Sequence, residues 1–193
     1  SIHGAIHVAA LLLLISSSGF AQAFPAAHIV LVHDGLLPTL ITDPAFDQGS
    51  GPEYADILGA GMTNTNNDLL VAQKIRGAFP QVPPSGFDGY SWRFDTDLNS
   101  NTGYQQYDYI GIDWEILLQP SDGGWTVNKW SPSGGYVNLP AATILVQHSA
   151  TGDVVGVRFD ANEIGRPPYL NWIAWNGVAP DWEDVAPDHT VSW

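Results

Sequence analysis

Short apolar segments separated by turn-forming residues constrain the fold of this chain more than any other feature. The 193 residues include 20 Gly and 14 Pro, gathered in clusters such as DQGSGPEY, PQVPPSGFDG, DLNSNTG and SPSGG. Gly and Pro favour turns because Gly tolerates positive φ and Pro presets its own φ. The intervals between clusters leave room only for short helices. The spacing therefore predicts short strands joined by turns.

Apolar and polar residues alternate with a period of two inside these segments. In YSWRF the rings of Tyr90, Trp92 and Phe94 fall on one face, and Ser91 and Arg93 fall on the other. A strand places successive side chains on opposite faces, so this alternation is typical of a half-buried strand. The segments with the same pattern are IDWEIL with Leu118 (112–118), VVGVRF (154–159) and LNWIAW (170–175).

Five more segments have strand-like composition, namely 28–32, 55–63, 68–75, 125–130 and 142–147. About nine short strands with turns between them predict an all-β fold. We expect an antiparallel β-sandwich of the jelly-roll or immunoglobulin-like kind, formed by one domain over residues 24–193.

The charge balance limits the possible partners. Lys and Arg number 6 against 20 Asp and Glu, which gives a formal net charge of -14 at pH 7. Such a chain repels nucleic acid, so nucleic-acid binding is not expected. Bound cations would relieve the repulsion between carboxylates, which makes extracellular calcium a natural partner. The chain has no Cys, so disulfides, thiolate metal sites and thiol nucleophiles are excluded.

The beginning of the sequence has the pattern of an export signal. No Asp, Glu, Lys or Arg precedes Asp34. The apolar run 5–15 is too short to cross a bilayer, and small residues follow it up to Ala21-Gln22-Ala23. We expect residues 1–23 to be a signal peptide, cleaved before Phe24, in a secreted or cell-surface protein without a stable membrane span. The alternatives are a buried helix of the mature fold and a pilin-type assembly helix.

The loop DTDLNSNTG contains the most specific local pattern. Asp95, Asp97 and Asn99 place oxygen atoms at alternate positions in a tight turn, and Asp113 starts the next strand, from which it could reach the same site. Hard cations such as calcium bind several carboxylate and amide oxygens at about 2.3–2.6 Å. We therefore expect a structural calcium site. The alternative is a set of Asx-turns, in which these side chains bond only their own backbone.

Some of the eight tryptophans are candidates for ligand contact. Large aromatic rings are mostly buried, but exposed rings can stack on sugars. Trp130 and Trp175 are out of phase with the core-facing positions of their segments, and Trp182 lies in an expected loop. We expect these three residues to contact a ligand. The alternative for each ring is a place in the core or over a sheet edge.

The sequence contains few signs of catalysis. It lacks a G-x-S-x-G elbow, an H-E-x-x-H pair and a P-loop. The stretch YDYIGIDWEI is similar to the strand motif of the family-eighteen chitinases at Asp108, Asp113 and Glu115, but a further Asp of that motif is Gly111 here. Those enzymes are (β/α) barrels, which need more residues and regular helices. We expect no enzymatic activity, and a small glycoside hydrolase using Asp113 and Glu115 remains an alternative.

The order of several segments resembles a family. HIVLVHDG, ADILGAGMT, WRFDTDLNSNTGY, YIGIDWEILL and VGVRFDANEIG together are similar to the family-nine carbohydrate-binding modules and DOMON-like β-sandwiches. The likeness spans nearly all of residues 28–188, with LLPTL where the family carries a tryptophan after the Asp-Gly pair. It implies an exported, non-catalytic module that binds an extracellular glycan or another cell-surface component. The rival interpretation is a surface-layer or filament subunit that associates with itself.

Overall fold

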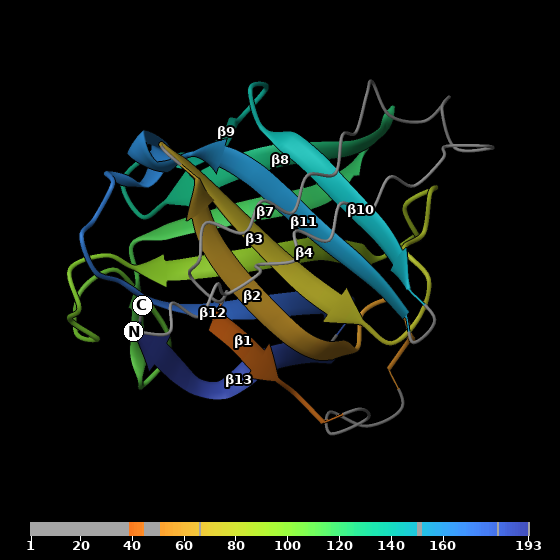
Figure 1. Cartoon of the computed structure of the whole chain (residues 1–193), viewed down its shortest axis with the longest axis horizontal. Helices are drawn as coiled ribbons and strands as arrows, with labels where there is room; N and C mark the ends of the chain where they lie inside the picture. Colours follow the sequence, from red (N-terminus) through yellow and green to blue (C-terminus); the bar gives the residue numbers. More distant parts are fainter. Residues whose placement is uncertain (1–38, 45–50, 66, 150–151, 181, 193) are drawn as a thin grey trace, which may run out of the picture.

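The structure is a computed structural model that describes residues 39–44, 51–65, 67–149, 152–180 and 182–192. The expected signal peptide (1–23) and the expected strand at 28–32 lie outside these residues. The described part is built of antiparallel β-strands and contains one short 3-10 helix but no α-helix (Figure 1). Within these ranges, therefore, no helix has the length and hydropathy needed to cross a membrane.

Sheet A has five antiparallel strands in the order β1-β2-β3-β11-β10. Their bounds are β1 Thr39–Thr42, β2 Ile57–Thr65, β3 Asp68–Ile75, β11 Gly152–Asp160 and β10 Thr143–Ser149. Two hairpins, β2–β3 and β10–β11, are joined side by side because β11 pairs with β3. The strand expected at 68–75 is confirmed with the same bounds, and those at 55–63 and 142–147 are confirmed within a few residues.

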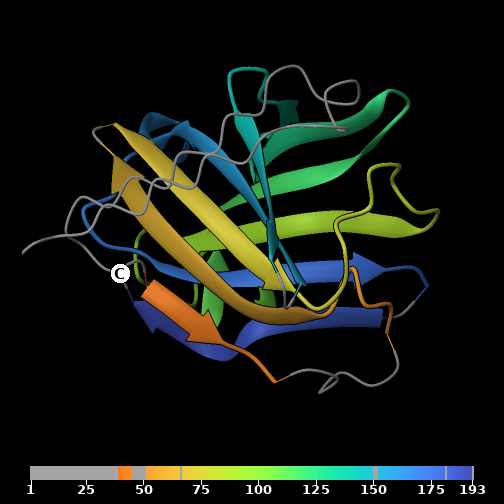
Figure 2. The same ribbon diagram turned by 45° about the vertical axis from the view of Figure 1, so that its right-hand side comes forward.

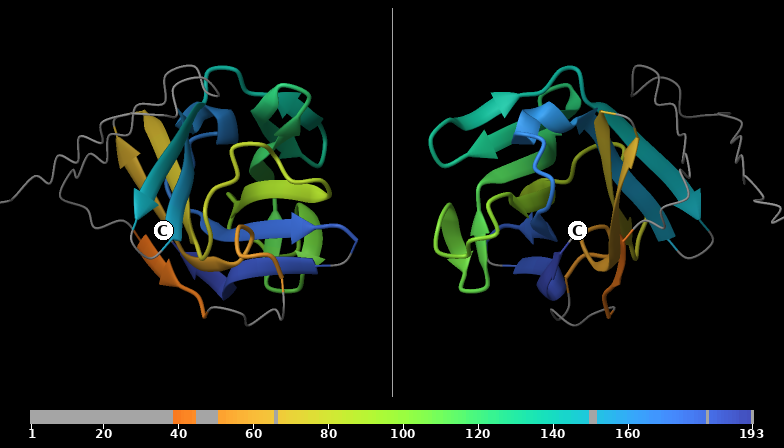
Figure 3. Two further views of the ribbon diagram at one scale, coloured as in Figure 1. Left: turned by 90° about the vertical axis from the view of Figure 1, so that its right-hand side faces the viewer. Right: turned by 60° about the vertical axis from the view of Figure 1, so that its left-hand side comes forward.

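Sheet B has six antiparallel strands in the order β13-β12-β4-β7-β8-β9. Their bounds are β13 Trp182–Ser192, β12 Asn171–Val178, β4 Phe87–Asp95, β7 Trp114–Ser121, β8 Gly124–Ser131 and β9 Gly135–Asn138. Sheets A and B lie face to face, as the turned views in Figures 2 and 3 show. The expected β-sandwich-like architecture is confirmed at this level.

A third, two-stranded sheet lies against sheet B. It consists of β5 (Tyr104–Tyr107) and β6 (Ile110–Ile112), which form a hairpin. Both views in Figure 3 place this hairpin on the side of sheet B that faces away from sheet A. Its two isoleucines are buried with Ile173 and Val185 of sheet B in a second, smaller core cluster. The hairpin therefore covers part of the outer face of sheet B.

The main core lies between sheets A and B and confirms the period-two pattern. Tyr90, Trp92 and Phe94 of β4 are fully buried there, as are Val155 and Val157 of β11. Burying one large aromatic or aliphatic side chain stabilises a fold by about 1.5–3 kcal/mol, so this alternation fixes which face of each strand turns inward.

The stretch 112–118 is not the single strand that the alternation predicts. Ile112 ends β6 and belongs to the smaller cluster, whereas β7 begins at Trp114 and its Ile116 packs in the main core. Between them Asp113 lies outside both strands, and its backbone N–H donates to the carbonyl of Phe94 at 2.9 Å. The apolar alternation runs across this break because the apolar residues of β6 and of β7 happen to be in phase, although they are buried in different clusters.

Candidate functional site

Three carboxylates converge where β4 ends and β7 begins. Asp95 is the last residue of β4 and is fully buried, Asp97 lies in the following exposed loop, and Asp113 directly precedes β7. One oxygen from each of the three lies within 4.8 Å of the others. Two oxygens on opposite sides of a calcium ion are about 4.6–5.2 Å apart, so this spacing suits a single cation of that size.

The loop after β4 is also ordered by Asx-type hydrogen bonds. The carboxylate of Asp97 accepts hydrogen bonds from the backbone N–H of Asn99 at 3.0 Å and from the hydroxyl of Thr102 at 2.9 Å. The side-chain oxygen of Asn99 accepts from the backbone N–H of Asn101 at 3.1 Å. Asn99 therefore contributes its N–H to the acidic group, while its amide oxygen caps its own turn. Its expected role as an oxygen ligand stays a prediction.

Asp113 is held in place from the start of the loop. Its carboxylate accepts hydrogen bonds from the backbone N–H and the hydroxyl of Thr96 at 2.9 and 3.0 Å. Gly111, two residues earlier, passes under the loop so closely that a Cβ there would lie 2.1 Å from the carbonyl oxygen of Thr102 and 2.7 Å from that of Asn99. The hairpin β5–β6 and the acidic loop are thus packed together.

The electrostatics of the acidic group favour neutralisation of Asp95. Burial raises the pKa of the Asp95 carboxyl, and hydrogen bonding to Asp97 and the charge of Asp113 raise it further. Hydrogen bonds from the backbone N–H of Asn99 and the amide of Asn171 act in the opposite direction but do not cancel the rise in pKa. A cation placed among the three carboxylates would supply the missing opposite charge.

A second group of polar side chains lies on the outer face of sheet B. Arg93 of β4 donates from Nε to Glu115 of β7 at 2.9 Å, and the hydroxyl of Ser91 donates to the same oxygen at 2.5 Å. Glu115 projects away from the main core, as the alternation predicts, yet it is only 4% exposed. A charged pair at this depth needs each partner, because either charge alone would be costly to bury.

The hairpin β5–β6 closes over this group from the side of β12 and β13. Arg93 donates from Nη1 to the amide oxygen of Gln106 at 2.5 Å. The carboxylate of Glu183 accepts hydrogen bonds from the indole N–H of Trp175 at 2.8 Å and the hydroxyl of Tyr107 at 3.3 Å. Burial, with a further contribution from the charge of Glu183, raises the pKa of the Tyr107 hydroxyl far above its usual value, so it remains a donor.

Beside the pair lies a group of three aromatic rings that we call the aromatic face. Its members are Trp130 of β8, Tyr104 of β5 and Tyr136 of β9. Trp130 lies between the other two, with ring centroids 5.8 Å from Tyr104 and 6.3 Å from Tyr136. The two tyrosines are 51% and 57% exposed. The hydroxyl of Tyr136 donates to the free oxygen of Glu115 at 3.0 Å, which links the aromatic face to the buried pair.

The three tryptophans expected to contact a ligand lie in different places. Trp130 and Trp175 both project from the outer face of sheet B, as predicted. Trp182 is not in a loop, because it begins β13 and packs against the main core between the sheets. A Cβ added to Gly51 would lie only 1.8 Å from the ring of Trp182, so residue 51 must be Gly for the ring to fit there. The cause is strand pairing, since β13 extends further than the acidic, Pro-containing sequence suggested.

Several of the residues that build these groups have no clear signal in the sequence pattern. Arg93 was placed only on the polar face of YSWRF, although one of just six cations among 20 carboxylates is a signal in itself. Tyr104 and Tyr136 carry no such signal, because nothing local shows that β5 and β9 bring them to Trp130. Their meeting depends on tertiary pairing, which a single sequence does not reveal.

No protein-family model matches the chain, and a search of curated proteins gives no significant match.

Proposed function

We propose that this protein is an exported, non-catalytic module that binds carbohydrate on the aromatic face and is stabilised by calcium at the acidic loop. The observation that carries the proposal is the group Tyr104, Trp130 and Tyr136, two of whose rings are more than half exposed. Exposed rings that lie together on a sheet offer flat apolar surfaces against which the C–H face of a sugar ring can stack. The resemblance to the family-nine carbohydrate-binding modules points to the same ligand class.

The buried pair supports binding by holding polar groups next to these rings. Both oxygens of Glu115 accept hydrogen bonds, one from Ser91 and Arg93 and the other from Tyr136. Each hydrogen bond orders a side chain before the ligand binds, which lowers the conformational-entropy cost of binding. The phenol oxygen of Tyr136 keeps its lone pairs and can accept a hydrogen bond from a sugar hydroxyl. Trp175 packs against the smaller core cluster instead, so its contact with a ligand stays a separate prediction.

The acidic loop would support the aromatic face through Tyr104. The residue that follows the loop is Tyr104, the first residue of β5 and a member of the aromatic face. A calcium ion held by Asp95, Asp97 and Asp113 would cancel their repulsion and fix the path of the loop. It would thereby hold Tyr104 in position against Trp130, so cation binding and sugar binding would support each other.

The same contacts favour binding over glycoside hydrolysis. A catalytic carboxylate needs a free oxygen within reach of the scissile bond or of a water. Glu115 is almost completely buried and has a hydrogen-bond donor on each oxygen. Asp113 accepts both hydrogen bonds from Thr96 on one oxygen, and it lies beside Asp95 and Asp97. Glu115 and Asp113 therefore have different surroundings. A catalytic cleft shared by the two carboxylates is not needed to explain their positions.

Affinity electrophoresis of the chain in gels that contain neutral polysaccharides tests this proposal. We expect Trp130→Ala and Tyr136→Ala to abolish retardation by the polysaccharide that retards the wild type most. Tyr169→Ala is the matched control, because Tyr169 is 65% exposed and lies in the segment between the 3-10 helix and β12. If no neutral polysaccharide retards the wild type, or if all three variants behave alike, the aromatic face does not bind carbohydrate.

One observation favours a second candidate function, self-association into a surface layer or filament. Strand β9 is an edge of sheet B, all four of its residues are exposed, and Val137 and Tyr136 are both more than half exposed. An exposed edge strand can pair with a second chain. Light scattering after size exclusion, with and without calcium, separates the candidates: a monomer at tens of micromolar supports the binding module, and larger species abolished by Val137→Lys support assembly.

A further inference from the structure

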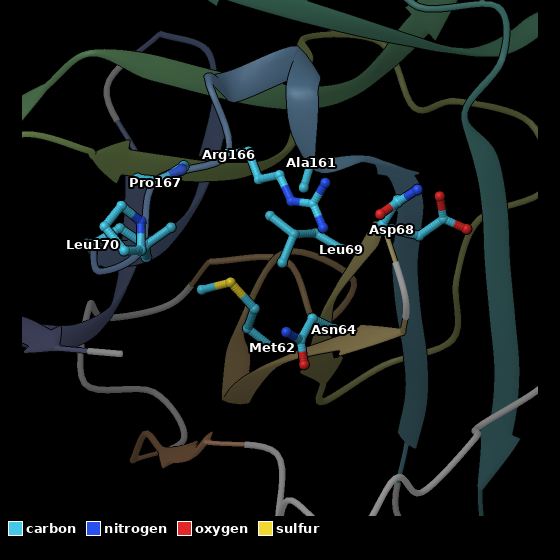
Figure 4. A pocket seen from close by; sticks show the side chains of 10 residues that line it. Met62, Asn64, Asp68, Leu69, Ala161, Arg166, Pro167 and Leu170 are labelled. Atoms are coloured by element: carbon cyan, nitrogen blue, oxygen red, sulfur yellow. The ribbon is translucent and has the colours of Figure 1, made fainter.

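A pocket of about 370 Å³ opens at an end of sheet A (Figure 4), and its lining includes Leu170, the neighbour of the Asn171 whose amide donates to Asp95. Its floor is apolar, formed by the buried side chains of Met62, Leu69 and Leu170. Its rim is polar and includes the amides of Asn64 and Asn67. An apolar floor with a few polar groups around it is the usual design of a small-molecule site, and the volume suits one monosaccharide-sized ligand.

Arg166 stands at this rim in an unusual backbone conformation. It follows the 3-10 helix η1 (Ala161–Ile164), and its φ is +47° directly after Gly165 at +78°. Non-glycine residues rarely adopt the left-handed region, and those that do often lie at functional sites. The backbone N–H of Arg166 donates to the carbonyl of Ala161 at 2.9 Å, which holds the residue in place. Figure 4 shows its side chain extending toward Leu69 and Ala161.

The guanidinium of Arg166 also differs in its charge environment from most cations of the protein. The protein has 6 cationic side chains against 20 carboxylates. Four of the cations, Arg76, Arg93, Lys129 and Arg158, form ion pairs. The side chain of Arg166 makes neither an ion pair nor a hydrogen bond with any part of the chain that the structure describes. In so acidic a protein, a positive charge at a pocket without a carboxylate partner attracts anions from solution.

The carboxylate on the rim of this pocket, Asp68, does not pair with Arg166. Asp68 lies on the rim but accepts a hydrogen bond from Arg158 Nε at 2.6 Å and also contacts Arg158 Nη2. Its charge is therefore balanced from the neighbouring strand β11, and Arg166 remains available. A single guanidinium close to a balanced carboxylate suits one negative charge better than two, which favours a carboxylate over a phosphate. The planar fork of arginine also matches a carboxylate through two parallel hydrogen bonds.

We infer that this pocket binds a monocarboxylate of monosaccharide size, such as a hexuronic acid, with Arg166 holding the carboxylate. Asn64 and Asn67 can donate to and accept from ring hydroxyls, and the apolar floor can contact the C–H face of the ring. Pro167 and Pro168 follow Arg166 and limit the conformations of that wall. The site is separate from the aromatic face and does not depend on the neutral-sugar binding proposed above.

Isothermal titration with galacturonate and glucuronate, and with glucose and inorganic phosphate as comparisons, tests this inference at one fixed ionic strength. We expect at least one uronate to bind, glucose to bind about tenfold or more weakly, and phosphate not to compete. Arg166→Asn is the informative variant, because Asn adopts positive φ more readily than Arg and so removes the guanidinium while easing the backbone conformation. It should retain or raise the melting temperature and lose uronate binding about tenfold or more.

Lys74→Gln is the matched control. It removes one positive charge from the opposite end of β3, about 20 Å from Asp68 by strand rise, and should leave uronate binding unchanged. The inference is overturned if glucose binds as well as the uronates, if phosphate displaces them, if both variants weaken binding equally, or if neither uronate binds the wild type. Equal weakening would show a general effect of net charge in place of a site.

Discussion

The guanidinium carbon of Arg93 lies 4.0 Å from the ring centroid of Trp175. The two residues belong to adjacent strands, β4 and β12, and both project from the outer face of sheet B. Arg93 also forms the ion pair with Glu115, so a single side chain joins three strands of this face. A stacked, largely desolvated guanidinium of this kind is attracted to the ring by about 1–2 kcal/mol. Arg93 therefore links β4, β7 and β12 on this face.

The ion pair on this face should be costly to break on one side only. Glu115→Leu leaves Arg93 buried without its counter-charge, and we expect it to lower the free energy of unfolding by about 3 kcal/mol or more. The double variant Arg93→Met with Glu115→Leu removes both charges and should recover about 1 kcal/mol or more of that loss. Urea denaturation followed by tryptophan fluorescence measures both values. A double variant no more stable than Glu115→Leu would show that the pair is not coupled.

Calcium should stabilise the protein through the acidic loop. At a calcium concentration about one hundred times the dissociation constant, binding adds about 2.7 kcal/mol, which corresponds to a rise in Tm of about 5–10 °C over the chelated protein. Asp97→Asn removes an exposed carboxylate from the cluster and should weaken calcium binding about tenfold or more. Differential scanning calorimetry with calcium and with a chelator measures the shift.

The control for this experiment is Asp122→Asn, which makes the same change of charge in the exposed turn between β7 and β8. Its calcium-dependent rise in Tm should equal that of the wild type. A wild-type Tm that is the same in calcium and in chelator would mean that the three carboxylates form only a turn. A shift that survives Asp97→Asn would place the cation elsewhere.

The alternation of the sequence predicted the core well, because burial on one face of a strand is a local property. Tyr90, Trp92 and Phe94 repeat it within five residues, and all three are fully buried. The same logic failed at Asp113, where two strands of different sheets follow one another in phase and look like one. A period of two cannot show where pairing partners change.

The candidate site was only partly predictable for the same reason. Asp95 and Asp97 are two residues apart, so their proximity follows from sequence spacing. Asp113 lies near them as expected, although β5 and β6 come between the loop and β7 and Asp113 itself lies outside both neighbouring strands. The contact of Tyr104 with Trp130 and Tyr136 depends on β5 folding back over sheet B and on β9 pairing with β8. Such contacts arise from tertiary pairing of segments that carry no local signal for one another.

Gly111 should be essential for the path of the acidic loop. An added Cβ would lie 2.1 Å from the carbonyl oxygen of Thr102, and that oxygen belongs to backbone that cannot rotate away. We expect Gly111→Ala to lower the free energy of unfolding by about 1–3 kcal/mol and to weaken calcium binding. Gly123→Ala is the matched control, because a Cβ there meets no atom within 4 Å. Urea unfolding measures the stability of both variants. Equal stability of the two would contradict the close packing of β6 against the loop.

Asp184 should contribute to the contact between the two sheets despite its place in an acidic segment. It is almost fully buried, and its carboxylate accepts a hydrogen bond from the backbone N–H of Ile57 at 2.6 Å, which joins β13 of sheet B to β2 of sheet A. Asp184→Ala leaves this buried N–H without its acceptor, and we expect a loss of about 2 kcal/mol in the free energy of unfolding. Asp184→Asn keeps an acceptor oxygen and should cost less.

Asp122→Ala, in an exposed turn, should leave the stability within about 0.5 kcal/mol of the wild type. Hydrogen exchange of the Ile57 amide gives a local measure: Asp184→Ala should speed it, and Asp122→Ala should not. An unchanged exchange rate in Asp184→Ala would show that this hydrogen bond does not hold the sheets together.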